Sequence, residues 1–217
     1  MRKVFAVIIA VMAVMIVGGI WFWFFSNKKP SQNNFQSQNN SSVPAHIGQI
    51  FYDLPEVYAS GSNGFSIRYP VGYSVDESYR YQEFGPGLDI GGVKFVIPAT
   101  MATGVNLSNF DTGVSVEEIL NTQECSANLF VDQANPAVSI IDRGVSYSVA
   151  EMSGAGAGNF YEEKVWVILG INPCIAVRYF IHSTNIGNYT PGTIKEFDKQ
   201  ALIDQFDEIR RSLIINQ

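Results

Sequence analysis

The stretch NFYEEKVWVILGINPCIAVRYFIHS, residues 159–183, contains two apolar runs on either side of a short turn. The runs at 159–169 and 173–183 are rich in the β-branched and aromatic residues that favour strands. The residues between them, GINP at 170–173, are typical of a hairpin connection. We therefore predict two long antiparallel strands that pair at the centre of a sheet.

Shorter runs on both sides of this hairpin add further strands to the predicted sheet. In GFSIRYP, residues 64–70, Phe65, Ile67 and Tyr69 alternate with polar residues, which is the period of a strand. Pro70 ends the run because proline has no N–H to donate to a ladder. The remaining expected elements are strands at 94–99, 112–120 and 138–152 and a short helix at 125–131.

The chain ends in a predicted amphipathic helix within residues 192–215. Its apolar stripe follows the spacing i, i+4, i+7 and i+11 and consists of Leu202, Phe206, Ile209 and Leu213. The helix begins either with a capping box at Thr193 and Glu196 or with a cap at Asp198. Many strands followed by one long helix predict an α+β fold, with an antiparallel sheet and helix packed on it.

Two short motifs at the ends of this predicted domain resemble those of PsbP-like domains, a family related to the extrinsic P subunit of photosystem II. The first motif consists of Phe65, Tyr69, Pro70 and Tyr73. The second motif consists of Phe206, Ile209, Ser212 and Leu213. The resemblance implies an α/β/α sandwich, with helices packed on a central antiparallel sheet, as in bacterial membrane-anchored proteins. It implies no enzyme activity, and it transfers no catalytic residue.

Residues 4–25, VFAVIIAVMAVMIVGGIWFWFF, contain no charged residue and no proline. As a helix they would extend about 33 Å, enough to cross a hydrocarbon core of about 30 Å. The aromatic residues at 21–25 fall where such a helix meets the lipid headgroups. We therefore predict a transmembrane signal anchor. A cleaved signal peptide has a shorter apolar run that ends in small residues, and a pilin-type helix would need an acidic residue and a processing site.

The predicted chain has four parts: cytoplasmic residues 1–3, a transmembrane helix at 4–25, a flexible Ser-, Asn- and Gln-rich linker at 26–48, and a globular domain at 49–217. Basic residues flank the apolar run on both sides, so the positive-inside rule does not decide its orientation. Two cysteines in the domain suit an oxidising compartment. We therefore expect a single-pass protein of the cell membrane, with its N-terminus inside and its C-terminal domain outside the cytoplasm.

The charge of the predicted exported part excludes some classes of partner. From Pro30 onward there are ten Lys and Arg residues against twenty Asp and Glu residues, a net charge near −10. Such an acidic chain repels nucleic acid and anionic membrane surfaces. We therefore expect no nucleic-acid partner. The expected partners are the membrane, through residues 4–25, and a protein or small ligand of unknown identity.

Cys125 and Cys174 are the two cysteines of the chain, and we expect a structural disulfide between them. The alternative is two separate buried thiols. Two thiolates alone do not complete a tetrahedral zinc site, and the chain lacks a Cys-x-x-Cys redox motif. We therefore assign no metal and no cofactor.

Polar residues of the second strand of the hairpin are the first candidate binding site. Arg178 and His182 lie on the same face by strand alternation. If Glu162 lies opposite them on the paired strand, the three residues form a cluster that either binds a small anion or acts as an acid–base pair. The alternative is a cross-strand charge pair without a ligand. The chain has one further histidine, His46, and it falls in the linker.

Acidic doublets at 76–77, 117–118 and 162–163 do not form paired-carboxylate sites by themselves, because neighbours on a strand point to opposite faces. We expect these side chains to be solvated. Residues 154–158, GAGAG, lie between two strand-like runs, which favours a hairpin loop over a dinucleotide-binding motif.

The loop STNIGNYTPG at 183–192 is a second candidate recognition edge, unless it is a plain connector. Its candidate ligand-binding residues are Asn185, Asn188 and Tyr189. The leading hypothesis is a non-enzymatic binding or assembly module, anchored to the membrane and exposed outside the cytoplasm. The alternatives are a hydrolase-like enzyme that uses His182, Arg178 and Glu162, and a pilin-like structural subunit.

Overall fold

The computed structural model describes residues 53–61, 64–132 and 136–216. The predicted transmembrane segment at 4–25 and the predicted linker at 26–48 lie outside these residues. Within the described ranges, no helix combines the length and the apolar character that crossing a membrane requires.

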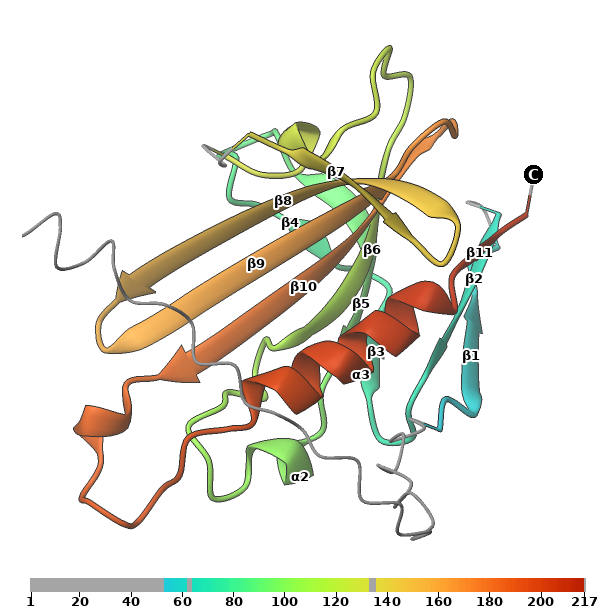
Figure 1. Cartoon of the computed structure of the whole chain (residues 1–217). Helices are drawn as coiled ribbons and strands as arrows, with labels where there is room; N and C mark the ends of the chain where they lie inside the picture. Colours follow the sequence, from blue (N-terminus) through green and yellow to red (C-terminus); the bar gives the residue numbers. More distant parts are fainter. Residues whose placement is uncertain (1–52, 62–63, 133–135, 217) are drawn as a thin grey trace, which may run out of the picture. The chain divides into compact units, whose positions relative to one another are not determined.

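An eight-stranded antiparallel sheet forms the centre of the described domain (Figure 1). Its strand order is β3-β5-β6-β10-β9-β8-β7, with β4 paired to β5. These strands are β3 (Ser74–Asp76), β4 (Arg80–Tyr81), β5 (Ile90–Val96), β6 (Gly113–Ile119), β7 (Val138–Asp142), β8 (Val145–Gly156), β9 (Asn159–Ile168) and β10 (Cys174–Thr184). A second, three-stranded sheet consists of β1 (Glu56–Ala59), β2 (Phe65–Tyr69) and β11 (Ile214–Ile215).

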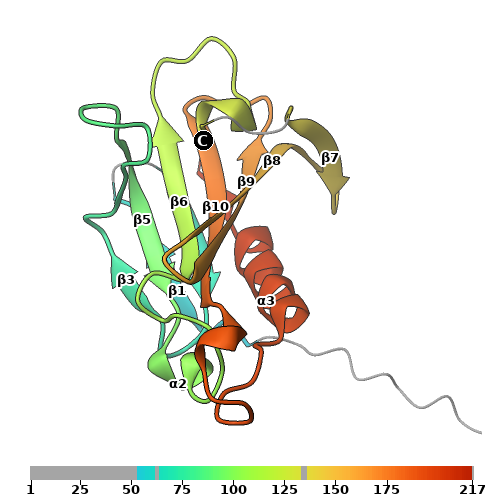
Figure 2. The same cartoon turned by 90° about the vertical axis from the view of Figure 1, so that its left-hand side faces the viewer.

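Helical structure in the described residues is limited to two α-helices and two short 3-10 turns. They are α2 (Ala99–Ala102), η1 (Ala127–Leu129), η2 (Ile186–Asn188) and α3 (Lys199–Arg211). The predicted α/β/α sandwich with helices packed on the sheet is therefore wrong. The described domain is a β-rich fold, in which α3 lies against one face of the large sheet (Figure 2) and α2 buries no residue.

Loops and the short 3-10 turn η1, in place of a second α-helix, cover part of the face of the large sheet opposite α3. Ala127, Phe130 and Val131 lie in and after η1 and are buried. They share a core cluster with Tyr81 of β4 and with Val165 of β9. Because these loop residues already exclude water from part of the sheet, the second face needs no packed helix.

The predicted central hairpin is confirmed. Strands β9 and β10 pair from Ala176–Val167 to Thr184–Asn159, and β10 pairs with β6 on its other side. Alternate residues of β10 face the two cores. Tyr179 and Ile181 pack with α3, whereas Ala176 and Arg178 face the loop-covered side.

The stripe of α3 supplies most of the apolar contact between the helix and the sheet. Leu202, Phe206 and Ile209 are buried, and Leu213 follows the helix and is half-buried. The Asp198 side chain accepts a hydrogen bond from the Ala201 N–H at 3.0 Å. This side chain caps the helix, so the helix starts after Asp198.

The two motifs at the ends of the domain meet in space. Phe65 and Ile67 of β2 are buried, and β2 pairs with β11 directly after α3. The Arg68 N–H donates a hydrogen bond to the Ser212 hydroxyl at 2.8 Å, and Tyr73 donates to the Gln205 side chain at 3.0 Å. The small sheet therefore joins the first strand of the motif to the end of α3.

A buried arginine fixes α3 to the edge of the large sheet. The Arg210 guanidinium is 1% exposed and lies 3.9 Å from the centre of the Trp166 ring. It donates hydrogen bonds to Tyr179 and to Asp142, the last residue of β7. Arg211 donates to the same carboxylate at 2.8 Å. Burial alone would raise the pKa of Asp142, but the two arginines lower it, and the net shift is downward.

This carboxylate predicts an acid-dependent loss of stability. A carboxyl with a lowered pKa in the folded state stabilises the fold above its unfolded pKa, and this contribution is lost as the pH falls through the folded pKa. We expect the unfolding free energy of the full-length chain to fall below about pH 4. The Asp142→Asn variant should be less stable at neutral pH and show a shallower fall, whereas Asp53→Asn, at an exposed site, should match the wild type. Unfolding curves between neutral and acidic pH measure both, and identical pH profiles for Asp142→Asn and the wild type would contradict this role.

The expected disulfide is confirmed. Cys125 and Cys174 are bonded, with Cα atoms 5.3 Å apart and a sequence separation of 49 residues. The bond joins the segment before η1 to the first residue of β10. It therefore ties the loop that covers the second face to the centre of the sheet.

Removing this disulfide should destabilise the domain strongly. Closing a loop of this size restricts the unfolded chain by about 4 kcal/mol in the chain-entropy account. For a chain of this length, that corresponds to a fall of about 10 °C in melting temperature. Thermal unfolding of a Cys125→Ala, Cys174→Ala double variant measures the loss. Labelling of both thiols in the native wild-type chain without reductant would contradict the bond.

Candidate functional site

The Arg178 side chain lies at the centre of a buried charge cluster on the loop-covered face. It is fully buried and forms two hydrogen bonds with Glu117 of β6, at 2.7 and 2.8 Å. It also donates to Glu163 of β9 and to the Phe130 backbone carbonyl, the latter at 2.6 Å. Its guanidinium stacks on Tyr81, 3.5 Å from the ring centre. Four strands, β4, β6, β9 and β10, and the covering loop thus meet at one cation.

The structure does not bring Glu162 together with Arg178 and His182. Glu162 pairs with Ile181 in the register of β9 and β10, so its side chain lies on the α3 face. There it forms an ion pair with Lys199, at the start of the helix. Arg178 and His182 lie on the opposite face, and Glu163 takes the position that was expected for Glu162.

The expectation that the acidic doublets are solvated is wrong for Glu117 and Glu163. Glu117 is fully buried, and Glu163 is 7% exposed. Burial raises the pKa of the Glu163 carboxyl, although the charge of Arg178 opposes the shift. Two carboxylates share one guanidinium here, and Ser115 also donates to Glu117 at 2.7 Å. Because its charged groups bond to one another and to the protein, the cluster serves to hold the strands and the loop in place.

His182 lies farther along the same face and is paired with a carboxylate. Its Nδ1 atom is 2.7 Å from Asp111, and its ring stacks at 4.6 Å on Tyr161. Nearby, Lys94 is 9% exposed, and its ammonium lies 4.7 Å from the centre of the Phe180 ring. Burial lowers the pKa of this ammonium. The uncovered part of the face is therefore aromatic, with one acid–histidine pair and one nearly buried lysine.

The three candidate residues of the loop at 183–192 bond within the protein. Asn185 caps η2 by accepting from the Gly187 N–H at 2.9 Å. Asn188 donates to the Gly158 carbonyl at 3.1 Å, and Tyr189 bonds to Thr184 at 2.7 Å. The loop thus holds the turn between β8 and β9. These contacts explain the residue types without a ligand, and the binding role of the loop stays a prediction.

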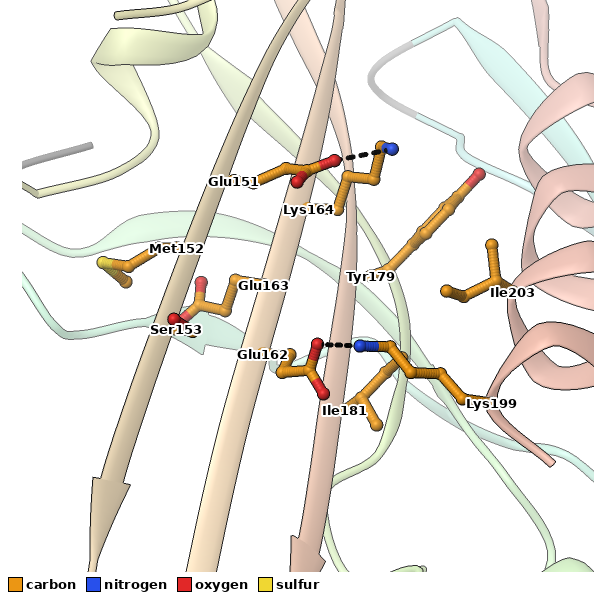
Figure 3. A pocket seen from close by; sticks show the side chains of 10 residues that line it. All are labelled: Glu151, Met152, Ser153, Glu162, Glu163, Lys164, Tyr179, Ile181, Lys199 and Ile203. Atoms are coloured by element: carbon orange, nitrogen blue, oxygen red, sulfur yellow. Dashed lines mark hydrogen bonds and ion pairs between the residues drawn. The ribbon is translucent and has the colours of Figure 1, made fainter. Parts of the chain in front are cut away.

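A groove that opens to solvent lies between the sheet and α3, and we call it the sheet–helix groove. Its volume is about 440 Å³. Two ion pairs stand in it, Glu151–Lys164 across β8 and β9 and Glu162–Lys199 between β9 and α3 (Figure 3). Apolar and aromatic side chains also line it, namely Tyr179, Ile181 and Ile203. Sequence reasoning named Glu162 in this groove and missed the other residues.

The donor set of the groove suits a polar ligand with apolar parts. The groove contains two carboxylates and two ammonium groups, all partly exposed, so both charge signs are available to a ligand. No group of three or more His, Cys, Asp or Glu side chains in the described part of the chain is placed to hold a metal ion.

Comparisons with known proteins give similarity of structure only. No family model and no curated protein matches the chain. It is similar to cyanobacterial PsbP (CyanoP) from Synechocystis sp. PCC 6803, with 14% identity, coverage of 81% of this chain and 98% of that chain, and a TM-score of 0.40. A structure from Bacteroides thetaiotaomicron VPI-5482 has 12% identity, coverage of 74% of this chain and 48% of that chain, and a TM-score of 0.39. Neither similarity assigns an activity or a partner.

The Arg178 cluster predicts a large stability effect. Arg178→Met leaves two buried carboxylates without their cation, and breaking such a buried pair costs about 3–5 kcal/mol. Adding Glu117→Gln and Glu163→Gln should restore part of the loss. Glu162→Gln, which removes a partly exposed ion pair from the other face, should cost less than about 1 kcal/mol. Denaturant unfolding of the four full-length chains tests this ranking, and equal losses for Arg178→Met and Glu162→Gln would contradict it.

Proposed function

We propose that this protein is a non-enzymatic binding or assembly module, anchored in the cell membrane through residues 4–25 and exposed outside the cytoplasm. The linker at 26–48 would let the domain reach a partner near the membrane. The apolar run at 4–25 and the disulfide between Cys125 and Cys174 support this location, since such bonds persist in oxidising compartments.

The observation that carries the proposal is the sheet–helix groove. Its walls belong to rigid elements, β8, β9, β10 and α3, and its charged side chains are already held in place by ion pairs. A preformed site on such elements loses little conformational freedom when a partner binds. The exposed Glu151 side chain, 64% accessible, and the half-buried Ile203 offer a partner both charge and apolar surface.

The contacts of the polar residues on the other face favour binding over catalysis. Every nitrogen of the Arg178 guanidinium donates to a protein acceptor. The second ring nitrogen of His182 is buried and makes no hydrogen bond to a described residue. A general base needs hydrogen-bond reach to its substrate. The hydrolase-like alternative therefore requires this face to open, whereas the groove is accessible as it stands.

A pull-down from solubilised membranes tests the proposal, with the full-length chain as bait. Ile203→Glu places a charge on the apolar wall of the groove and should abolish capture of the partner. Phe110→Glu changes a side chain that is 89% exposed and lies outside the groove, so this bait should capture what the wild type captures. Capture of the same proteins by the wild-type and Ile203→Glu baits would count against the groove.

A further inference from the structure

One edge of the large sheet is open over half of a strand. Strand β7 pairs with β8 only from Val145 to Val149, whereas β8 pairs with β9 as far as Gly156. In Figure 1, β8 continues well past the part that lies beside β7. Residues Ala150–Gly156 therefore have no described strand on their outer side.

The hydrogen-bond pattern shows which groups of this edge point outward. The Leu169 N–H donates to the Ser146 carbonyl at 3.0 Å, so this opposed pair is hydrogen-bonded. Bonded and non-bonded pairs alternate along an antiparallel ladder. Even-numbered residues of β8 therefore bond to β9, and the N–H and C=O groups of Glu151, Ser153 and Ala155 point away from it. No hydrogen bond joins these outward groups to any residue of the described ranges.

This edge lacks the features that usually block strand addition. Proteins protect open edges with proline, bulges, several charges or a covering element. The stretch AEMSGAG at 150–156 has no proline, pairs with β9 without a break, and has one charge, Glu151. We propose that an extended segment of a partner polypeptide adds to this edge as a further strand. The inference rests on the proposed binding function and names its partner class.

The two faces of the edge define the chemistry of that segment. On the α3 side, Glu151 is 64% exposed beside the sheet–helix groove, where the Glu162 carboxylate is 37% exposed. Basic side chains on this side of the added strand complement these carboxylates and the acidic chain. On the other side, Gly154 pairs with Tyr161, and the space where a side chain would stand is empty. An aromatic side chain of the partner fits over this glycine.

The occupant is an alternating basic and apolar segment of another polypeptide, not a second copy of this edge. The open stretch is limited at one end by β7 and at the other by the turn at Ala157 and Gly158. If two copies paired along the whole stretch, the turn of each would meet the β7 strand of the other. A separate segment of about seven residues meets neither obstacle.

A synthetic heptapeptide tests the proposal with the full-length chain in detergent. Its even positions are lysine and lie opposite Glu151, Ser153 and Ala155 in an antiparallel pairing. Its odd positions are valine, except for a phenylalanine at position 3, which lies opposite Gly154. A peptide of the same composition with its lysines in one block is the control. Fluorescence anisotropy measures affinity, and amide hydrogen exchange measures protection. We expect preferential binding of the alternating peptide and slower exchange at Glu151, Ser153 and Ala155.

Two substitutions at one position separate edge pairing from other contacts. Ser153→Pro removes an outward N–H and leaves the bonds to β9, so the chain should fold and bind the peptide about tenfold more weakly or worse. Ser153→Ala keeps the N–H and should bind within about twofold of the wild type. The Ser153→Pro chain should melt at the same temperature as the wild type, which shows that it is folded. If this variant is unstable, protection of the three outward amides in the wild-type chain tests strand addition instead.

The outcomes distinguish this inference from the proposed function. Equal binding of both peptides, undiminished binding by Ser153→Pro, or no protection of the three outward amides overturns strand addition. If Ile203→Glu abolishes capture from membranes while these amides stay unprotected, the groove binds a partner in another way. Protection of the same amides without peptide, together with a dimer in analytical ultracentrifugation, identifies a second copy as the occupant and also overturns the inference.

Discussion

The charge cluster around Arg178 is the constraint on which the arrangement of the central strands depends. One guanidinium without solvent contact holds carboxylates from the strands on both sides of β10 and the carbonyl of Phe130 from the covering loop. An ion buried this far is tolerated only with close, complete partners. The register of β6, β10 and β9 and the position of the loop are therefore set together.

A second buried arginine has the corresponding role on the other face. Arg210 joins α3 to β7 through Asp142 and to β10 through Tyr179, and Trp166 of β9 covers its plane. Each face of β10 thus contributes one residue to a network around a buried arginine. This residue is Arg178 itself on the loop-covered face and Tyr179 on the α3 face. Between the two networks lies an apolar sheet, so the helix and the loop are each oriented by directional bonds as well as by packing.

The sequence predicts the elements that depend on local pattern. The apolar period of 159–183 and the stripe with its cap at Asp198 identify the central hairpin and α3, and an even cysteine count identifies the disulfide. The sequence did not predict how many helices pack on the sheet, because loop residues such as Phe130 cover a sheet face and show no helical periodicity.

The acidic partner of Arg178 in the candidate cluster could not be predicted, because local sequence pattern does not say which residues of neighbouring strands share a face. Strand alternation tells that Glu162 and Glu163 face opposite ways, but only the length of the turn tells which of them shares a face with Arg178. The available signal was Arg178 itself, a cation within an apolar strand, which required buried carboxylates on both neighbours. The sheet–helix groove was even harder to predict from the sequence, because its two ion pairs join residues of three separate elements.

The alternation along β10 also limits how this chain can change in length. Inserting or deleting one residue within the strand would exchange its faces, placing the guanidinium of Arg178 against Phe206 and the Tyr179 ring among the acidic side chains. Loops such as the one at 183–192 have no alternation of faces that a change in length would reverse. Variation in length is therefore compatible with the connections around the sheet, while its central strand must keep its residue count.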